Sequence, residues 1–314
     1  MTTAYLVVPC YNEEAVLPET VKRLTEKLRG LIASGRAGED SRILLVDDGS
    51  KDRTWELIAG FHQENRLVSG LKLAHNRGHQ NALLAGLMTA RERADCAISL
   101  DADLQDDIDV LDAFLDKYHE GCEVVYGVRN KRDTDTLFKR STAQGFYKFM
   151  KMLGVDIVYN HADYRLMGKR ALDALAQYKE VNLFLRGIVP EIGFKSGVVT
   201  YDRHERFAGE SKYPLKKMLH FAVDGITSFS VRPLKIISNF GIFISLASIA
   251  GLLYALISHF MGATVAGWTV IVCSIWLLGG IQLLCIGVLG EYIGKIYSEV
   301  KGRPRYVVEA FLDE

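Results

Sequence analysis

Residues 236–290 form an unbroken run of 55 positions that contains no Asp, Glu, Lys or Arg. One membrane-spanning helix needs about 20 apolar residues, so a run of this length predicts two spans joined by a short turn. We place the spans at about 236–260 and 268–289, with 261–267 as the turn. The alternative is a buried helical hairpin in a soluble protein, although core helices rarely lack charge over so long a stretch.

Basic residues flank this run on both sides, whereas the predicted turn has no Lys or Arg. They are Lys212, Lys216, Lys217, Arg232 and Lys235 before it, and Lys295, Lys301, Arg303 and Arg305 after it. Because cytoplasmic flanks of membrane helices are rich in Lys and Arg, both termini are predicted to be cytoplasmic, in a multi-pass protein of the inner (plasma) membrane. Residues 209–235 are either an amphipathic juxtamembrane segment or an ordinary surface helix, and residues 291–314 are predicted to be a cytoplasmic tail.

Strand-like and helix-like segments alternate from residue 6 to residue 127, within a predicted catalytic domain at 1–208. Strands are expected at 6–9, 42–46, 68–73, 96–100 and 123–127, with helices between them that reach about Arg29, begin near Arg53, and cover 79–90 and 108–118. This alternation predicts an α/β fold with a mostly parallel sheet and helices on both faces.

Composition excludes several classes of function. The 38 basic and 38 acidic residues balance, which gives no reason to expect a nucleic-acid partner. The five cysteines lack the paired spacing of a metal site, and the N-terminus runs directly into a strand without a signal peptide, so the catalytic part is expected to be reduced and cytosolic. The glycines form neither a dinucleotide fingerprint nor a P-loop, which argues against an oxidoreductase or an NTPase.

Two carboxylates, Asp101 and Asp103, directly follow the apolar strand at 96–100. They are expected at the carboxyl end of that strand, where open α/β sheets bind their ligands. Hard oxygen ligands one residue apart suit a Mg²⁺ or Mn²⁺ ion that also touches a diphosphate. The alternative is a solvated acidic turn before the helix that begins near Ile108.

Polar residues also follow the other predicted strands, namely Tyr11, Asn12, Glu13, Asp47, Asp48 and Asn76. Each of them alone is explicable as a turn or helix-cap residue. Because the carboxyl ends of parallel strands share one edge of a sheet, together they predict a site at that edge.

Five motifs in this order resemble glycosyltransferase family 2: Pro-Cys-Tyr-Asn-Glu at 9–13, Asp-Asp-Gly-Ser at 47–50, Asn-Arg-Gly at 76–78, Asp-Ala-Asp-Leu-Gln-Asp at 101–106 and Asp-Tyr-Arg-Leu-Met at 163–167. The similar subgroup is the polyprenyl-phosphate glycosyltransferases, which include dolichol-phosphate mannose synthases and bacterial bactoprenol glucosyltransferases. The resemblance extends over Gly-Glu-Ser-Lys-Tyr at 209–213, the hairpin and residues 287–305.

The resemblance implies a Rossmann-like GT-A domain over 1–208 and an inverting transfer of one hexose to undecaprenyl phosphate, or another polyprenyl phosphate, at the cytoplasmic membrane face. The product would serve cell-envelope glycan modification. UDP-glucose is the leading donor, with UDP-N-acetylglucosamine and UDP-galactose as alternatives. Two more distant alternatives are a processive polysaccharide synthase and an inactive membrane scaffold. The sequence lacks the Gln-x-x-Arg-Trp string typical of processive synthases, and it keeps the acidic motif that an inactive scaffold would be expected to lose.

The resemblance also assigns roles by position. The nucleotide sugar would be bound by Pro9, Tyr11, Asn12, Glu13, Asp47, Asp48 and Arg129, and the divalent ion by Asp101, Asp103 and Gln105. The catalytic residues would be Asp163, Asp103 and Arg165. Asp163 would act either as a base near the anomeric carbon or by orienting Arg165 or the sugar hydroxyls.

The acceptor phosphate would be bound by Arg140, Arg203, Arg206, Ser211 and Lys212. Guanidinium groups suit phosphate, but the three arginines and Lys212 can also be explained as juxtamembrane or surface charges. Relatives form tetramers, and Gly290-x-x-x-Gly294 permits close helix approach or marks a loose turn, so a homo-oligomer is expected. Other expected partners are the bilayer, a lipid-sugar flippase and a downstream glycosyltransferase.

Overall fold

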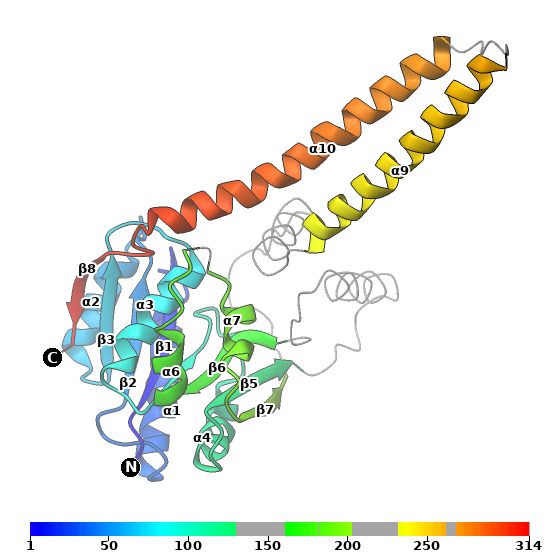
Figure 1. The fold of residues 1–314 in the computed structure, drawn as a ribbon. Coiled ribbons are helices and arrows are strands. Elements are labelled where there is room, and N and C mark those ends of the chain that lie inside the picture. The colour runs from blue at the N-terminus through cyan, green and yellow to red at the C-terminus, as the bar shows by residue number, and fades with distance from the viewer. Residues whose placement is uncertain (130–160, 182, 203–231, 262–267, 314) are drawn as a thin grey trace. The chain divides into compact units, whose positions relative to one another are not determined.

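The computed structural model describes residues 1–129, 161–181, 183–202, 232–261 and 268–313. They belong to two compact units. The first is an α/β unit that contains the described residues up to 202 together with 303–313, and the second contains two long helices (Figure 1). The predicted acceptor-phosphate ligands, at positions 140, 203, 206, 211 and 212, lie outside the described residues.

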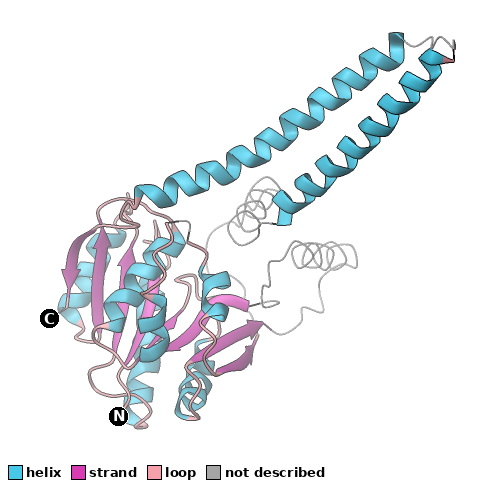
Figure 2. Cartoon of the chain, in the orientation of Figure 1, coloured by secondary structure: helices cyan, strands magenta, loops and turns pink. Residues whose placement is uncertain are grey.

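The α/β unit is built on one sheet of eight strands within the described residues (Figure 2). The strands are β1 (Ala4–Cys10), β2 (Arg42–Asp47), β3 (Val68–Leu73), β4 (Cys96–Ser99), β5 (Val124–Arg129), β6 (His161–Gly168), β7 (Ser196–Tyr201) and β8 (Val308–Leu312), in the order β7-β5-β6-β4-β1-β2-β3-β8. Strands β1 to β4 pair in parallel, and so do β5 and β7. Only β6 and β8 are antiparallel to their neighbours among these strands.

Helices cover both faces of this sheet. They are α1 (Leu17–Ala33), α2 (Thr54–Glu64), α3 (His79–Arg91), α4 (Leu111–His119, after a 3₁₀ turn at Ile108–Val110), α6 (Lys169–Leu175) and α7 (Leu185–Glu191). Leu6 and Val8 of β1 belong to a core cluster with apolar residues of α1, α2 and α4, while Val7 faces α3. All seven residues of β1 are therefore buried, as expected for a central strand of a doubly covered parallel sheet.

The predicted α/β fold with a mostly parallel sheet is confirmed, and the first four strands and three helices lie close to their predicted positions. The sequence did not reveal that β6 is inserted antiparallel between β5 and β4. Such a pairing depends on contacts between residues far apart in the chain and has no local signature.

The C-terminal residues differ most from the prediction. Residues 291–314 were expected to form a tail, but helix α10 continues to Lys301 and β8 then pairs antiparallel with β3, placing Leu312 opposite Gly70. Lys72 bonds Glu309 at 2.8 Å and Arg93 bonds Asp313 at 2.8 Å, while the Arg93 guanidinium lies 4.7 Å from the Phe311 ring centroid. The end of the chain is therefore part of the α/β unit.

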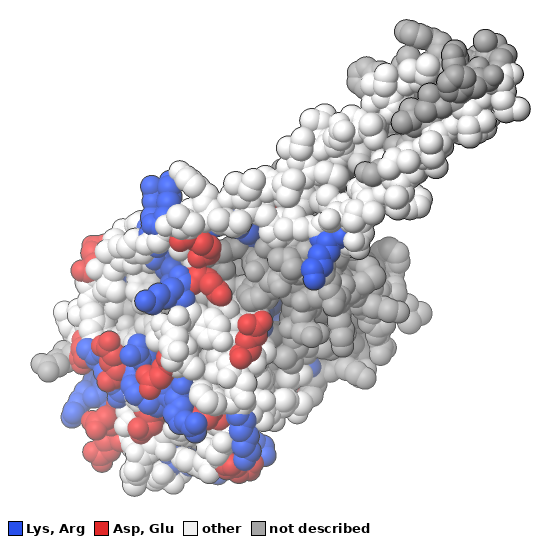
Figure 3. All heavy atoms as spheres, viewed as in Figure 1, with Lys and Arg blue, Asp and Glu red and all other residues white. Residues whose placement is uncertain are grey.

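The helical unit contains α9 (Arg232–Phe260) and α10 (Trp268–Lys301). Helix α9 ends and α10 begins at the predicted positions, whereas α10 continues well beyond the predicted end of the second span at 289. Many of their apolar side chains are exposed, including Phe243, Leu246 and Leu283 at 67%, 62% and 72%. Charged residues gather on the α/β unit and are scarce on the helices (Figure 3). Among the described residues, Leu277–Lys301 is long and apolar enough to cross a membrane, and the apolar stretch Pro233–Ile244 is shorter.

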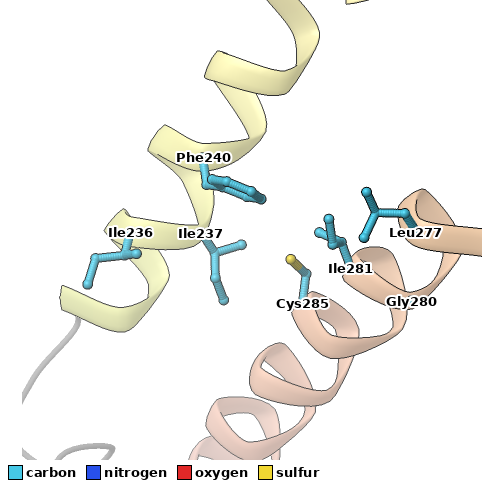
Figure 4. Close-up of a pocket in the computed structure, with 7 residues that line it drawn as sticks. All are labelled: Ile236, Ile237, Phe240, Leu277, Gly280, Ile281 and Cys285. Carbon is cyan, nitrogen blue, oxygen red and sulfur yellow. The ribbon is translucent and has the colours of Figure 1, made fainter. Parts of the chain in front are cut away.

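The contact between α9 and α10 is apolar near the start of α9. A cavity of about 440 Å³ lies there, with Ile236, Ile237 and Phe240 on one helix and Leu277, Ile281 and Cys285 on the other (Figure 4). Among the described residues, no charged side chain lines it. The two helices thus present apolar groups to each other as well as outward.

Candidate active site

The loops at the carboxyl ends of β1, β2 and β3 are tied together by backbone hydrogen bonds to acidic side chains. Asp48, which follows β2 and is 2% exposed, accepts from the backbone N–H of Arg77 at 2.7 Å and of Gly78 at 2.8 Å. These two donors belong to the loop before α3. Asp48 therefore fixes the distance between two strand-end loops. Because both of its carboxylate oxygens already accept these hydrogen bonds, Asp48 is less available to bind a ligand directly.

Gly49 permits this close approach. Its φ is +65°, and a Cβ atom there would lie 2.6 Å from the Asn76 backbone nitrogen and 2.7 Å from the His75 carbonyl carbon. Both the positive φ and the lack of space select glycine. The neighbouring Asp47 is fully buried, and its Oδ2 has no hydrogen-bond partner within the described chain. Burial raises the pKa of Asp47, partly offset by hydrogen bonds from Ser50.

The loop after β1 is fastened to the loop after β2. Asn12, with a left-handed φ of 55°, accepts from the Lys51 backbone N–H at 2.9 Å and donates its own backbone N–H to Ser50 Oγ at 3.0 Å. The backbone N–H of Glu13 donates to Thr54 Oγ1 at 2.9 Å. Tyr11 between them stays 41% exposed, so its ring is available to stack on a flat ligand, whereas Pro9 lies within β1.

The acidic motif follows β4 and is hydrogen-bonded to a residue of α1. Thr20 Oγ1 donates to the Ala102 carbonyl at 2.7 Å, and Leu104 has a left-handed φ of 56°. Asp103 Oδ1 accepts from the Gln105 backbone N–H at 3.1 Å, which closes a tight turn. The three predicted metal ligands are therefore brought into one short loop at the carboxyl edge of the sheet.

Strand β6 brings Asp163 beside this loop, because Arg165 pairs with Ser99 of β4. Asp163 is surrounded by cationic groups: Arg165 Nη2 lies 2.6 Å from Oδ1, and Arg186 donates Nε to Oδ1 at 3.2 Å and Nη2 to Oδ2 at 3.1 Å. His79 Nε2 lies 3.6 Å from Asp163 and 3.8 Å from Asp101. Burial opposes ionisation, but His79 nearby and the two arginines hold the pKa of Asp163 well below its usual range.

Arg165 is not placed to reach a ligand. Its side chain is 1% exposed, and Nη1 donates to the Leu185 carbonyl at 3.3 Å. Arg186 contacts the same carboxylate, but 34% of its side chain is exposed. Arg186 is therefore the arginine of this cluster that a substrate can reach. Burial of His79 opposes protonation, but the nearby carboxylates of Asp163 and Asp101 raise the pKa of His79.

Arg129 lies at the end of β5, opposite Tyr201 of β7. Its Nε donates to the Tyr201 hydroxyl at 3.1 Å, and its Nη2 lies 3.4 Å from Asp106 Oδ1. Burial tends to lower the pKa of Arg129, but Tyr201 and the charges of Asp106 and Asp101 raise it. Arg129 is therefore a fixed cation near the acidic motif.

A divalent ion fits the chemistry of this donor set, although no group of three or more His, Cys, Asp or Glu among the described residues forms a complete metal cage. Ions such as Mg²⁺ usually take one or two carboxylates and complete their shell with substrate phosphates and water. Burial, with a contribution from the carboxylates of Asp106, Asp163 and Asp103, raises the pKa of Asp101 to about 6, and nearby His79 opposes this. A cation would relieve that accumulated negative charge.

A comparison of sequences decides the family. Residues 5–176 match the profile of "Glycosyl transferase family 2", more than half of the chain. The chain belongs to glycosyltransferase family 2. It is therefore an enzyme that transfers a sugar, and the predicted family is confirmed.

Full-length relatives agree with this assignment. The chain is 60% identical over 305 residues to YkoT of Bacillus subtilis (strain 168), named as an uncharacterized glycosyltransferase, covering 97% of this chain and 90% of the relative. It is 38% identical over 308 residues to the SfII prophage-derived bactoprenol glucosyl transferase of Shigella flexneri, covering 97% and 96%. These relatives match the helices as well as the catalytic unit.

The fold agrees as well. The structure is similar to mannosyl-3-phosphoglycerate synthase from Rubrobacter xylanophilus, with a TM-score of 0.50 at 16% identity, over 76% of this chain and 75% of that one. The GT-A-like fold of a family 2 glycosyltransferase is thus shown.

Four residues of this glycosyltransferase site were not predicted from the sequence: His79, Arg186, Asp106 and Tyr201. His79 directly follows the motif at 76–78 and Asp106 is the last residue of the acidic motif at 101–106, which was the one available signal. Arg186 and Tyr201 reach the site through α7 and β7, whose positions depend on the non-sequential strand order.

Proposed function

We propose that this glycosyltransferase transfers one hexose, with inversion, from a UDP-sugar to a polyprenyl phosphate at the cytoplasmic face of the membrane. UDP-glucose is the leading donor. The observation that carries the proposal is the full-length similarity, helices included, to a protein named bactoprenol glucosyl transferase. The intact acidic motif speaks against an inactive scaffold.

On the donor side, the exposed ring of Tyr11 is suited to stack on the uracil base, and the fastened loops that carry Asn12, Glu13 and Asp48 would surround the nucleoside. A Mg²⁺ or Mn²⁺ ion held by Asp101, Asp103 and Gln105 would neutralise the charge that grows on the diphosphate as the nucleotide leaves. Arg129 would add a permanent positive charge beside that diphosphate.

On the acceptor side, a phosphate oxygen attacks the anomeric carbon as the bond from that carbon to the UDP oxygen breaks, so the configuration inverts and UDP leaves. A phosphate monoester is already largely ionised near neutrality, so no base needs to remove a proton. We propose that Asp163 instead holds Arg186, whose exposed guanidinium would orient phosphate oxygens. The further acceptor-phosphate ligands that we propose from the sequence are Arg140, Arg203, Arg206, Ser211 and Lys212.

The course of the chain supports a two-helix membrane hairpin. Strand β7 precedes the helices and β8 follows them, yet both belong to the same sheet. The chain must therefore return to the side of the membrane from which it left, which requires an even number of crossings. Since Leu277–Lys301 is apolar and long enough to be one of them, we propose that α9 is the other.

The test is a transfer assay with the purified full-length protein, Mn²⁺, undecaprenyl phosphate, and UDP-glucose, UDP-galactose or UDP-N-acetylglucosamine supplied separately. Mass spectrometry of the extracted lipid should find a single added hexose, with UDP-glucose giving the highest rate. A product only with UDP-N-acetylglucosamine would overturn the hexose assignment. A polymer of several sugars would indicate a processive synthase, and the lack of any lipid product would overturn the acceptor.

A further inference from the structure

Asp106, the last residue of the acidic motif, contacts Tyr201 and Arg129 at the carboxyl ends of two other strands. Its Oδ1 accepts from the Tyr201 hydroxyl at 2.6 Å and lies 3.4 Å from Arg129 Nη2. The Tyr201 hydroxyl also accepts from Arg129 Nε at 3.1 Å. Asp106 and Tyr201 are 4% and 2% exposed, so this contact is shielded from water, whereas 28% of the Arg129 side chain remains exposed.

The contact holds one edge of the Arg129 guanidinium and leaves another without a partner among the described residues. Nε and Nη2 are engaged by Tyr201 and Asp106, and Nη1 makes no hydrogen bond to any described residue. Arg129 and Tyr201 are Cα partners in the parallel pair of β5 and β7, so the strand register sets their contact. The edge of Arg129 that carries Nη1 therefore points in a fixed direction.

Aromatic packing holds Tyr201 in turn. The ring of Tyr164 on β6 meets the ring of Tyr201 edge to face, with centroids 5.2 Å apart and an interplanar angle of 83°. The Tyr164 hydroxyl donates to the backbone carbonyl of Asp107 at 2.9 Å, directly beside Asp106. Contacts therefore connect the acidic loop to β6, β6 to β7, and β7 back to the acidic loop, next to Arg129.

We infer that Asp106 and Tyr201 are positioning residues that aim Arg129 at the diphosphate of the nucleotide sugar. Asp106 is then the member of the acidic motif that acts through an arginine and not through the metal ion. A buried hydroxyl that bonds both the carboxylate and the guanidinium restricts Arg129 to one rotamer, so less entropy is lost when a phosphate binds. This inference rests on the proposed UDP-sugar donor.

The direct test is Tyr201→Phe, which keeps the ring and removes the hydroxyl. Loss of a hydrogen bond to charged groups should raise KM for the UDP-sugar and the Kd for UDP with Mn²⁺ about tenfold, while KM for polyprenyl phosphate stays unchanged. Asp106→Asn, which keeps the volume, should shift the same two constants in the same direction. The matched control is Tyr118→Phe, whose hydroxyl bonds the Asp95 carbonyl at 3.2 Å and is not part of the site.

A double-mutant cycle separates positioning from general structural support. If Tyr201 acts through Arg129, Tyr201→Phe should change UDP binding less than twofold in an Arg129→Ala background. A full tenfold loss in that background, or an equal rise in KM for both substrates, would overturn the inference. Unchanged UDP binding in Tyr201→Phe would overturn it as well. A wild-type protein that binds no UDP would instead overturn the proposed donor, so the two failures are distinguishable.

Discussion

Arg186 binds both carboxylate oxygens of Asp163, with Nε 3.2 Å from Oδ1 and Nη2 3.1 Å from Oδ2. With Arg165 on Oδ1 and His79 nearby, the carboxylate is held in its ionised form despite its burial, and its pKa lies well below the usual range. A carboxylate this strongly stabilised is a weak base. Its role in the transfer is therefore expected to be electrostatic and geometric.

The first prediction concerns the pH dependence of the transfer reaction. Between pH 5 and 8 the wild-type kcat/KM should show no inflection from Asp163, because that group stays ionised over the whole range. Asp163→Asn should lower kcat/KM by about a hundredfold at every pH, since one partner of a buried charge pair is lost. An acidic limb near pH 5 to 6 that disappears in the variant would instead identify Asp163 as a general base.

The second prediction concerns Asp101 and the metal ion. Its folded-state pKa of about 6 exceeds the value of about 3.9 expected in an unfolded chain, so the ionised group destabilises the fold as pH rises from about 4 through 6. In chelator at pH 7.5, Asp101→Asn should therefore unfold at the same or a higher temperature than wild type. The difference should disappear as the pH falls towards 4.

Adding Mn²⁺ and UDP should reverse this order, because a ligand that binds only the folded state raises its stability. The wild-type unfolding temperature should rise, and that of Asp101→Asn should rise much less. Equal rises in the two proteins would show that Asp101 does not bind the ion.

The sequence predicted the position of the strand-end carboxylates better than the surroundings of Asp163. Asp48, Asp101 and Asp103 each follow a predicted strand, so a local pattern and the geometry of parallel sheets were sufficient to place them at one edge. Asp163 was identified only by family resemblance, and its partners Arg186 and His79 were missed. Their meeting depends on β6 lying antiparallel between β5 and β4, which follows from long-range packing and not from the periodicity of any segment.

The third prediction concerns β8. Deleting residues 303–314 removes a strand that covers the edge of β3 and packs Leu312 against Gly70. The free energy of unfolding should fall by at least about 2 kcal/mol, and the exposed edge should promote aggregation in size-exclusion chromatography. The control is Glu309→Gln, which breaks only the half-exposed pair with Lys72 and should cost less than about 1 kcal/mol. A truncated protein as stable and monodisperse as wild type would contradict this role for β8.

The last prediction compares two glycines. Gly49→Ala should destabilise the protein by more than about 1 kcal/mol, because φ at this position is +65° and the new Cβ would meet the backbone of His75 and Asn76. The shift of that loop should also weaken binding of UDP with Mn²⁺, since Asp48 would lose its bonds to Arg77 and Gly78. Gly30→Ala is the matched control: Gly30 lies near the end of α1 with no neighbouring atom within 4 Å of a new Cβ, so alanine there should stabilise the helix by roughly 0.5–1 kcal/mol. Calorimetry of UDP binding and thermal unfolding, measured on both variants, test these two expectations. A Gly49→Ala protein that binds UDP as tightly as wild type would show that the spacing of these two loops does not govern UDP binding.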